Sequence, residues 1–347
     1  MRKSSGLIMA LAIFAVVLFG CASNDQPVDS TATNGESEEE QESETTTVSV
    51  GYMPNYASLN TVVAGMRIGS FEEEGINVEL VEFADGPTII AAMESGSIDV
   101  GYIGPGAHVL PIRGEAEIFA FSHLGNADEV IGNTEKGVNT IQDLEGKNIA
   151  VATGTSSETI LNLTLAEAGL TKDDVTLTDM DASAIVTAMT SGSVDAVATW
   201  SPNTNTIKNE LGDNAVMLSN NARYADEFPS IASWVITPGY ADENADVLER
   251  FTKGLFKAMD YRIDNLDEVA EWVAEEIAVD PASVLEQTGD GDWVTTEELI
   301  AMIEDGTIEA YYDQQQKNFV EAGQLTEEDL RPVSEYVLFD IMTSAAQ

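Results

Sequence analysis

Few side chains in this sequence combine the types and the spacing that catalysis or metal binding requires. Asp99 and Asp195 could supply a pair of carboxylates for acid–base chemistry, but each closes the same short turn, and this duplication favours a local structural role. His108 and His123 lie fifteen residues apart without a cysteine or carboxylate motif, which disfavours a catalytic zinc site. The run 101–106 lacks the Lys-Ser/Thr pair of a phosphate loop. We therefore expect neither an enzyme nor a bound cofactor.

Three loops have the composition of a binding site for a small polar molecule. Residues 51–56, 104–106 and 154–157 each follow an expected strand and lead into a helix. The start of a helix offers unpaired backbone N–H groups and a partial positive potential, and small residues let an anionic oxygen approach them. Simple capping of a helix is the alternative role for the hydroxyl residues in the third loop. The candidates for ligand contact are Asn55, Tyr56, Gly104, Pro105, Gly106, Thr155, Ser156 and Ser157.

An internal repeat indicates which elements position these loops. Residues 88–99 align without gaps with residues 184–195, and seven of the twelve positions are identical. Each copy has the pattern of a short helix, a Ser-Gly stop and a strand. Gly96 and Gly192 can take the left-handed conformation that ends a helix.

The order strand, helix, strand recurs upstream of each copy. Strands that alternate with helices predict parallel sheets with crossover helices, in which ligands bind beyond the carboxyl ends of the strands. Two related α/β lobes that face each other across a cleft are therefore expected. The expected strands are 48–52, 76–83, 148–153 and 175–180, and the expected helices between them are 57–74 and 158–168.

The N-terminus has the features of an exported, lipid-anchored protein. Arg2 and Lys3 precede an apolar run that is too short to span a membrane but has the length of a signal-peptide core. Cys21, the only cysteine, follows in Leu18-Phe19-Gly20-Cys21, which resembles the lipobox of bacterial lipoproteins. We expect residues 1–20 to be the signal peptide, Cys21 to be lipidated, and the acidic residues 21–47 to form a disordered tether.

The net charge limits the partners of this chain. Its 61 acidic and 15 basic residues give a formal charge of −46. Such a charge disfavours nucleic acid and anionic lipid surfaces as partners. We therefore expect no nucleic-acid binding, and contact with the membrane only through the lipid anchor. The acidic residues are spread along the expected helices, where solvation is their simplest role.

Several short motifs along residues 48–265 resemble the substrate-binding proteins of ABC importers for taurine, aliphatic sulfonates and nitrate. No one motif is diagnostic, but their order and spacing together are specific. The motifs are Ala84-Asp85-Gly86-Pro87, Gly101-Tyr102-Ile103-Gly104-Pro105, Leu124-Gly125-Asn126, Asp143-Leu144-Glu145-Gly146-Lys147, Gly154-Thr155-Ser156-Ser157, and the strand that ends in Trp200-Ser201-Pro202.

The resemblance implies a bilobal type II periplasmic-binding-protein fold, with two related mixed α/β lobes, a two-strand hinge and C-terminal helices. Lobe 1 would comprise residues 48–122 and 236–347, and lobe 2 residues 123–235, with hinge crossings near 122–126 and 233–236. It also implies an extracytoplasmic solute-binding protein, lipid-anchored at the cell membrane, that delivers its ligand to permease and ATPase subunits.

The C-terminal segment 241–347 has the pattern of amphipathic helices. We expect a packing role and no ligand chemistry from it. Leu248, Phe251, Leu255 and Met259 mark one apolar helix face.

The resemblance also extends the list of candidate ligand contacts. Trp200 and Trp234 would line the cleft, with core packing as the alternative for both. Glu158 stands where sulfonate-binding relatives often carry histidine, and the ligand loops contain no Arg or Lys. A zwitterion fits this pattern, so we expect taurine or a related aliphatic sulfonate, with its ammonium on Glu158 or Asp181. A thiamine-pyrimidine precursor, a nitrate-like anion and a lipid-anchored sensor module remain the alternatives.

Overall fold

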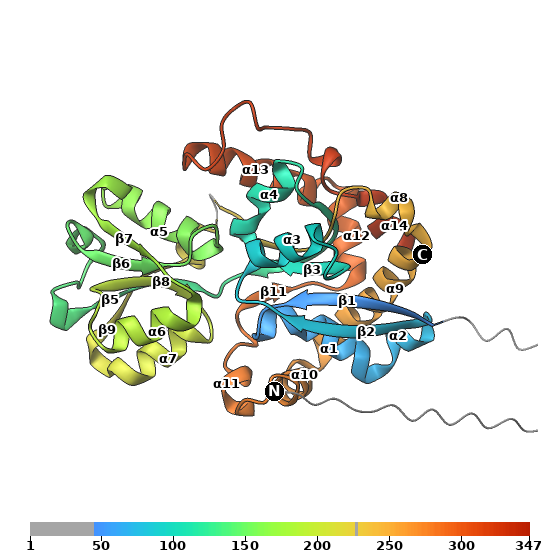
Figure 1. The fold of residues 1–347 in the computed structure, drawn as a ribbon, viewed down its shortest axis with the longest axis horizontal. Coiled ribbons are helices and arrows are strands. Elements are labelled where there is room, and N and C mark those ends of the chain that lie inside the picture. Colours follow the sequence, from blue (N-terminus) through green and yellow to red (C-terminus); the bar gives the residue numbers. More distant parts are fainter. Residues whose placement is uncertain (1–44, 226–227) are drawn as a thin grey trace, which may run out of the picture. The chain divides into compact units, whose positions relative to one another are not determined.

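The computed structural model of the chain describes residues 45–225 and 228–347 (Figure 1). Cys21, the expected signal peptide and almost all of the expected tether lie outside the described residues. The first strand begins at Thr46 and not at Val48, so the folded part starts slightly earlier than the sequence pattern predicts.

The first sheet has six strands in the order β11-β4-β10-β3-β1-β2. β1 runs parallel to β2 and β3, whereas β10 is antiparallel to both β3 and β4. β11 extends the β4 edge of the sheet. The strands are β1 (Thr46–Tyr52), β2 (Ile76–Glu82), β3 (Val100–Ile103), β4 (Glu117–Gly125), β10 (Ile231–Ile236) and β11 (Gly291–Trp293).

The second sheet has five strands in the order β7-β6-β8-β5-β9. β6 is parallel to β7 and β8, and β5 is antiparallel to β8 and β9. We call the parts of the chain around the two sheets the first half and the second half. The strands are β5 (Asp128–Asn133), β6 (Asn148–Val151), β7 (Thr176–Asp179), β8 (Ala196–Trp200) and β9 (Ala215–Asn220).

The chain passes from the first sheet to the second between Gly125 and Asp128, close to the expected crossing. It returns between Asn220 and Ile231. The expected return at 233–236 is therefore too late, because these residues form part of β10 inside the first sheet. All six residues of β10 are buried, and the strand pairs with β3 on one side and β4 on the other.

The two copies of the repeat form equivalent elements in the two sheets. α3 (Gly86–Glu94) precedes β3, and α6 (Ala182–Thr190) precedes β8. Gly96 and Gly192 both have φ = +71°, as the sequence pattern predicts for residues that end a helix.

The duplicated aspartates hold equivalent strands, β1 in the first sheet and β6 in the second. Asp99 accepts hydrogen bonds from the Ser49 backbone N–H at 2.8 Å and the Ser49 hydroxyl at 2.6 Å. Asp195 accepts one from the Asn148 backbone N–H at 2.9 Å. The expected structural role of both aspartates is thus confirmed.

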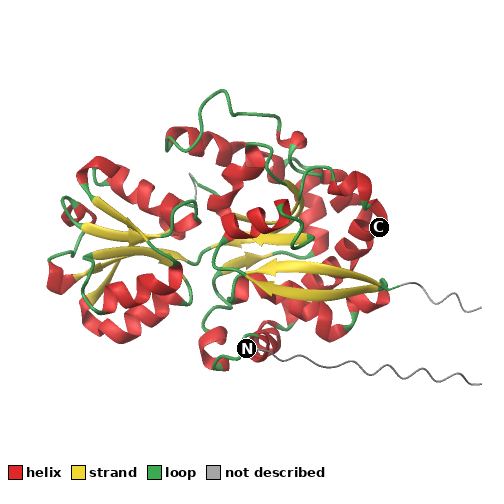
Figure 2. Cartoon of the chain, in the orientation of Figure 1, coloured by secondary structure: helices red, strands yellow, loops and turns green. Residues whose placement is uncertain are grey.

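Helices cover both sides of each sheet (Figure 2). The expected helix 57–74 is two helices, because Gly69 at φ = +79° ends α1 before α2 begins. Among the described residues no helix is long and apolar enough to cross a membrane. The remaining α-helices are α1 (Tyr56–Ile68), α2 (Ser70–Glu73), α4 (Val109–Ile112), α5 (Ser156–Glu167), α7 (Asn203–Leu211), α8 (Tyr240–Glu243), α9 (Ala245–Asp264), α10 (Leu266–Glu276), α11 (Pro281–Leu285), α12 (Thr296–Glu304), α13 (Thr307–Glu321) and α14 (Phe339–Ala345).

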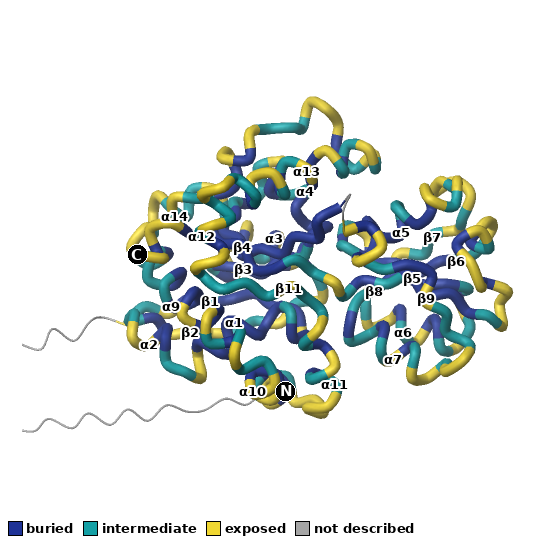
Figure 3. Tube along the Cα trace, turned by 180° about the vertical axis from the view of Figure 1, so that it is seen from behind, coloured by how far each residue is buried: buried dark blue, intermediate teal, exposed yellow. Residues whose placement is uncertain are grey.

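The core lies on the sheets, whose central strands are buried while the outer turns are exposed (Figure 3). α9 packs against α1 and α2 through the predicted apolar face: Leu248, Phe251, Leu255 and Met259 are all buried. Apolar area removed from water is the main stabilising term for such a helix.

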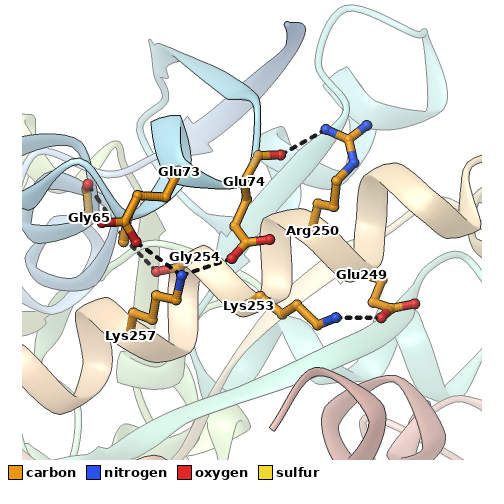
Figure 4. A network of polar contacts seen from close by, with 9 residues as sticks. Gly65, Glu73, Glu74, Glu249, Arg250, Lys253, Gly254 and Lys257 are labelled. Atoms are coloured by element: carbon orange, nitrogen blue, oxygen red, sulfur yellow. Dashed lines mark hydrogen bonds and ion pairs between the residues drawn. The ribbon is translucent and has the colours of Figure 1, made fainter. Parts of the chain in front are cut away.

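Ion pairs at the edge of this helix contact surface orient α9 on α2 (Figure 4). Lys257 Nζ lies 3.1 Å from Glu73 and 2.8 Å from Glu74, and Arg250 donates to the Glu74 carbonyl oxygen at 2.9 Å. Exposed pairs of this kind contribute little net free energy, so they favour one docking geometry more than they stabilise the fold.

We expect Asp99→Ala to lower the free energy of unfolding by about 1–3 kcal/mol, because the half-buried Ser49 N–H loses its acceptor. Asp195→Ala removes a single bond and should cost about 1 kcal/mol. Urea unfolding of both variants measures the difference. An Asp99→Ala variant as stable as the wild type would contradict the structural role.

Candidate functional site

One pocket collects loops from both sheets and contains about 630 Å³ of space, part of it open to solvent. Its wall is mostly apolar and aromatic, with a few polar side chains. The lining residues are Met53, Asn55, Ala57, Gly86, Pro87, Tyr102, Gly104, Pro105, Ala107, His123, Gly125, Ala127, Asp128, Thr155, Ser156, Trp200, Ser201, Ala232, Gln287 and Asp290.

The structure brings half of the expected contact residues to this wall: Asn55, Gly104, Pro105, Thr155, Ser156 and Trp200. The other half lie outside it: Tyr56, Gly106, Ser157, Glu158, Asp181 and Trp234. All three loops therefore contribute residues to one pocket, whereas half of the candidate side chains do not line it.

The hydroxyl groups of the third loop are directed to protein atoms. Thr155 Oγ1 donates to the Ala152 carbonyl oxygen at 2.7 Å, and it does not cap α5. The hydroxyls of Ser156 and Ser157 donate to Asp128 Oδ1 at 2.8 and 2.5 Å. The alternative of simple capping is thus wrong for Thr155, and the two serines hold a carboxylate.

Asp128 is the central acceptor of this region. It is buried, and its Oδ2 also accepts from Asn221 Nδ2 at 3.1 Å. Asn221 Oδ1 in turn accepts from the Asp128 backbone N–H at 2.6 Å. Burial raises the pKa of Asp128, and the three side-chain donors act against that rise. We call Asp128, Ser156, Ser157 and Asn221 the Asp128 cluster.

A second carboxylate enters the pocket from the C-terminal segment. Asp290 stands just before β11 and is hydrogen-bonded to Ser201, which follows β8 of the other sheet. Burial raises the pKa of Asp290 to about 6; the charges of Glu129 and Asp128 add to the rise, and the Ser201 contact and Lys208 oppose it. The expectation that segment 241–347 serves packing alone is therefore wrong.

Local sequence contains a weak signal for this residue. Asp290 lies in Gly289-Asp290-Gly291-Asp292-Trp293, a glycine-flanked acidic turn between two helical patterns. Such a turn is typical of a loop that approaches a ligand or another backbone closely. Gln287, in the preceding turn, also lines the pocket, but its side chain binds the Tyr56 N–H at 2.9 Å and the Ser283 carbonyl oxygen at 2.9 Å.

A stack of rings forms another part of the wall. His123 lies nearly parallel to Tyr102, with ring centroids 6.1 Å apart, and its ring centroid is 4.5 Å from that of Trp293. The guanidinium of Arg262, which is buried, lies 5.0 Å from the centroid of the Trp293 ring. Burial, with a smaller contribution from the Arg262 charge, lowers the pKa of His123 to about 3, so its imidazole is neutral.

Glu158 does not reach the pocket. One of its oxygens is 2.7 Å from Lys172 Nζ, and the other accepts from the Gly154 backbone N–H at 2.8 Å. Both contacts hold the carboxylate at the start of its own helix. The expected role of Glu158 as the ammonium partner is therefore not supported by its position.

Asp181 and Trp234 also lie elsewhere. Asp181 lines a neighbouring hollow, which shares Met53, Asn55 and Trp200 with the pocket. Trp234 is buried in β10, where its ring meets the edge of Tyr102 at 5.7 Å. For Trp234 the core-packing alternative holds.

The comparisons with known proteins agree with this architecture. Residues 58–269 match the family described as NMT1/THI5 like. The chain belongs to this family.

A binding protein of Brucella abortus is 32% identical over 298 residues, covering 86% of this chain and 92% of the relative. The taurine-binding periplasmic protein of Escherichia coli is 25% identical and covers 56% of this chain and 61% of its own. Among solved structures, the alkanesulfonate-binding protein of Xanthomonas axonopodis bound to MOPS has a TM-score of 0.65 at 20% identity, with 85% of this chain and 98% of that chain covered. The expected periplasmic-binding-protein fold is thus confirmed.

The polarity of the pocket differs from the sequence-based expectation. Two carboxylates, Asp128 and Asp290, face it, and none of the described residues that line it is Arg or Lys. Of the three hydroxyls expected to donate to a ligand, those of Ser156 and Ser157 are directed to Asp128 and that of Thr155 to the Ala152 carbonyl oxygen. This wall accepts hydrogen bonds more readily than it donates them, so it favours a ligand with N–H groups or a positive charge.

Asp290 should make the stability of this family member depend on pH. Its folded-state pKa of about 6 lies above the ordinary value of 3.8, so the folded protein keeps a proton that the unfolded chain loses. The stabilisation from Asp290 is complete below pH 3.8, the ordinary pKa of the carboxyl group. It is lost as the pH rises through the folded-state pKa of about 6. Asp290→Asn cannot titrate, so its stability relative to the wild type should rise between about pH 4 and pH 7 by about 1–2 kcal/mol.

Urea unfolding of both proteins across this pH range measures that difference. A pH-independent difference between them would contradict the raised pKa.

Proposed function

We propose that this chain is the extracytoplasmic component of an ABC importer that captures a small, amine-bearing organic solute. The observation that carries the proposal is the pair of carboxylates in a pocket whose described lining residues include neither Arg nor Lys. A protonated amine can meet Asp290, whose contact with Ser201 leaves acceptor capacity on the carboxylate. Permease and ATPase subunits are the partners that this role requires.

An aminopyrimidine fits the whole wall better than taurine does. Tyr102, Trp200 and Pro87 offer flat apolar surfaces for a ring. The neutral imidazole of His123 adds an uncharged aromatic surface, while its Nδ1 lies 3.0 Å from Ser122 Oγ and its Nε2 3.5 Å from the Tyr102 hydroxyl. The ammonium of taurine would be equally well placed at Asp290. Its sulfonate, however, would depend on backbone N–H groups, because the Ser156 and Ser157 hydroxyls bind Asp128.

The order of the ligand candidates therefore changes. An aminopyrimidine comes first and taurine second. Nitrate and amine-free sulfonates come last, since an anion near two carboxylates lacks a compensating cation in the wall. We also propose binding without catalysis, because the polar groups of the wall are engaged in holding the pocket and not in activating a nucleophile.

We expect Asp290→Asn to weaken binding of an amine-bearing ligand by about 1–3 kcal/mol, the scale of a lost charge-assisted hydrogen bond. Calorimetry should compare two pairs of probes: an aminopyrimidine with an aminomethyl group against the same ring with a methyl group, and taurine against ethanesulfonate. The loss should be confined to the amine-bearing member of whichever pair binds.

Glu158→Gln provides the matched control, because its carboxylate pairs with Lys172 outside the pocket. This variant should bind every probe as the wild type does. A larger loss in Glu158→Gln than in Asp290→Asn would restore the sequence-based assignment. Wild-type binding of ethanesulfonate but not of any amine would refute the proposed ligand class.

We further propose that Cys21 carries the lipid that holds the protein at the cell membrane. The support is the charged start, the apolar run and the tetrad Leu18-Phe19-Gly20-Cys21. Cys21→Ser should abolish incorporation of labelled fatty acid and release the protein from the membrane fraction. Full retention and labelling of this variant would contradict the lipid anchor.

A further inference from the structure

The two halves of the protein meet through backbone atoms at Gly106. This residue lies in the 3-10 turn Pro105–His108, which follows β3 of the first sheet. Thr155 and Ser156, at the start of α5, belong to the second half. A Cβ on Gly106 would overlap the carbonyl carbon and oxygen of Thr155 and the nitrogen of Ser156.

The local backbone does not itself require glycine at this position. Gly106 is not among the glycines with positive φ, so alanine could adopt its conformation without strain. Gly104, two positions earlier, also has an ordinary φ of −81°. A Cβ on Gly104 would come no closer than 3.8 Å to Ser156 Oγ, an ordinary contact. Of these two glycines, Gly106 is the one at which a Cβ would overlap the backbone of the opposite half.

The first half holds its side of this contact rigidly. His108 Nδ1 is 3.0 Å from the Pro105 carbonyl oxygen, and His108 Nε2 is 2.9 Å from the hydroxyl of Ser233 in β10. Gln315 of α13 donates to the same Pro105 oxygen at 3.4 Å. The turn that carries Gly106 is therefore tied to two other elements.

The second half is equally restrained. Ser156 and Ser157 bind Asp128, and Thr155 Oγ1 binds the Ala152 carbonyl oxygen. Since the atoms opposite Gly106 belong to the backbone of this restrained turn, they cannot rotate away as a side chain would. An added methyl group would be accommodated by moving the two halves apart.

We propose that Gly106 is a positioning residue that sets how closely the two halves can approach over the pocket. Its neighbours Pro105 and Ala107, and Thr155 and Ser156 opposite, all line the pocket, so the contact completes the wall around the ligand. The inference goes beyond the proposed function, because it depends on backbone contact and not on the identity of the ligand.

Distance measurement between spin labels tests this role without a ligand. Glu94 in α3 and Thr187 in α6 are exposed and lie in different halves. Labels on Glu94→Cys and Thr187→Cys, in the full chain with Cys21→Ser, report the separation of the halves. Gly106→Ala should lose the short distance found in the parent, whereas Gly104→Ala should keep it.

A second readout uses the probes that the parent protein binds, the aminomethyl pyrimidine or taurine. Gly106→Ala should weaken binding by about tenfold or more, since the closed form becomes a small fraction of the population. Unlike Asp290→Asn, it should weaken amine-bearing and amine-free probes to the same extent.

The outcomes are decisive whether or not the proposed ligand class is right. A short label distance that persists in Gly106→Ala overturns the inference, as does its absence in the parent. Loss of the native circular-dichroism spectrum in Gly106→Ala also overturns it, because the contact would then support the fold and not the approach of the halves. Failure of all probes to bind refutes only the proposed ligand class and leaves the distance test intact.

Discussion

The buried carboxylate of Asp128 is the interaction on which the arrangement of the site depends. It fixes the start of β5, the first turn of α5 and, through Asn221, the segment that returns to the first sheet. Asn221 also binds the Ser230 hydroxyl at 2.8 Å, just before β10. A buried charge is stable only while its donors stay in place, so loss of one of them affects the whole cluster. The wall of the pocket and the segment that leads from the second half back to the first sheet thus share one network of hydrogen bonds.

This network explains why the polarity of the pocket is the reverse of what the loop composition suggests. Ser156 and Ser157 stand at the start of a helix, where hydroxyl groups would suit an anion. A carboxylate of their own chain occupies them instead. The result is a wall to which Asp128 and Asp290 bring carboxylates, with no Arg or Lys among the described lining residues. Polar composition therefore indicates where a site lies, whereas hydrogen-bond partners decide which charge it accepts.

The sequence predicts those parts of the structure that depend on local rules. The glycine stops follow from a pattern about twelve residues long, and the occurrence of this pattern twice in the chain indicates a structural role for Asp99 and Asp195. Side-chain partners from distant segments could not be predicted in this way. Glu158 looks free until Lys172 folds back on it, and Asp290 reaches the pocket only because β11 joins the edge of the first sheet.

Arg262 places a buried positive charge next to the aromatic part of the pocket wall. It is a fully buried cation without an ion-pair partner among the described residues, held by Asn60 and Thr61 at 2.9 and 3.0 Å. Its guanidinium lies 5.0 Å from the Trp293 ring, and the centroid of that ring is 4.5 Å from that of His123 in the pocket wall. The guanidinium is a fixed charge that disfavours a second positive charge on His123, because it adds to the lowering of the His123 pKa. The ring that His123 contributes to the pocket wall therefore stays uncharged throughout the physiological pH range, whatever the state of the carboxylates.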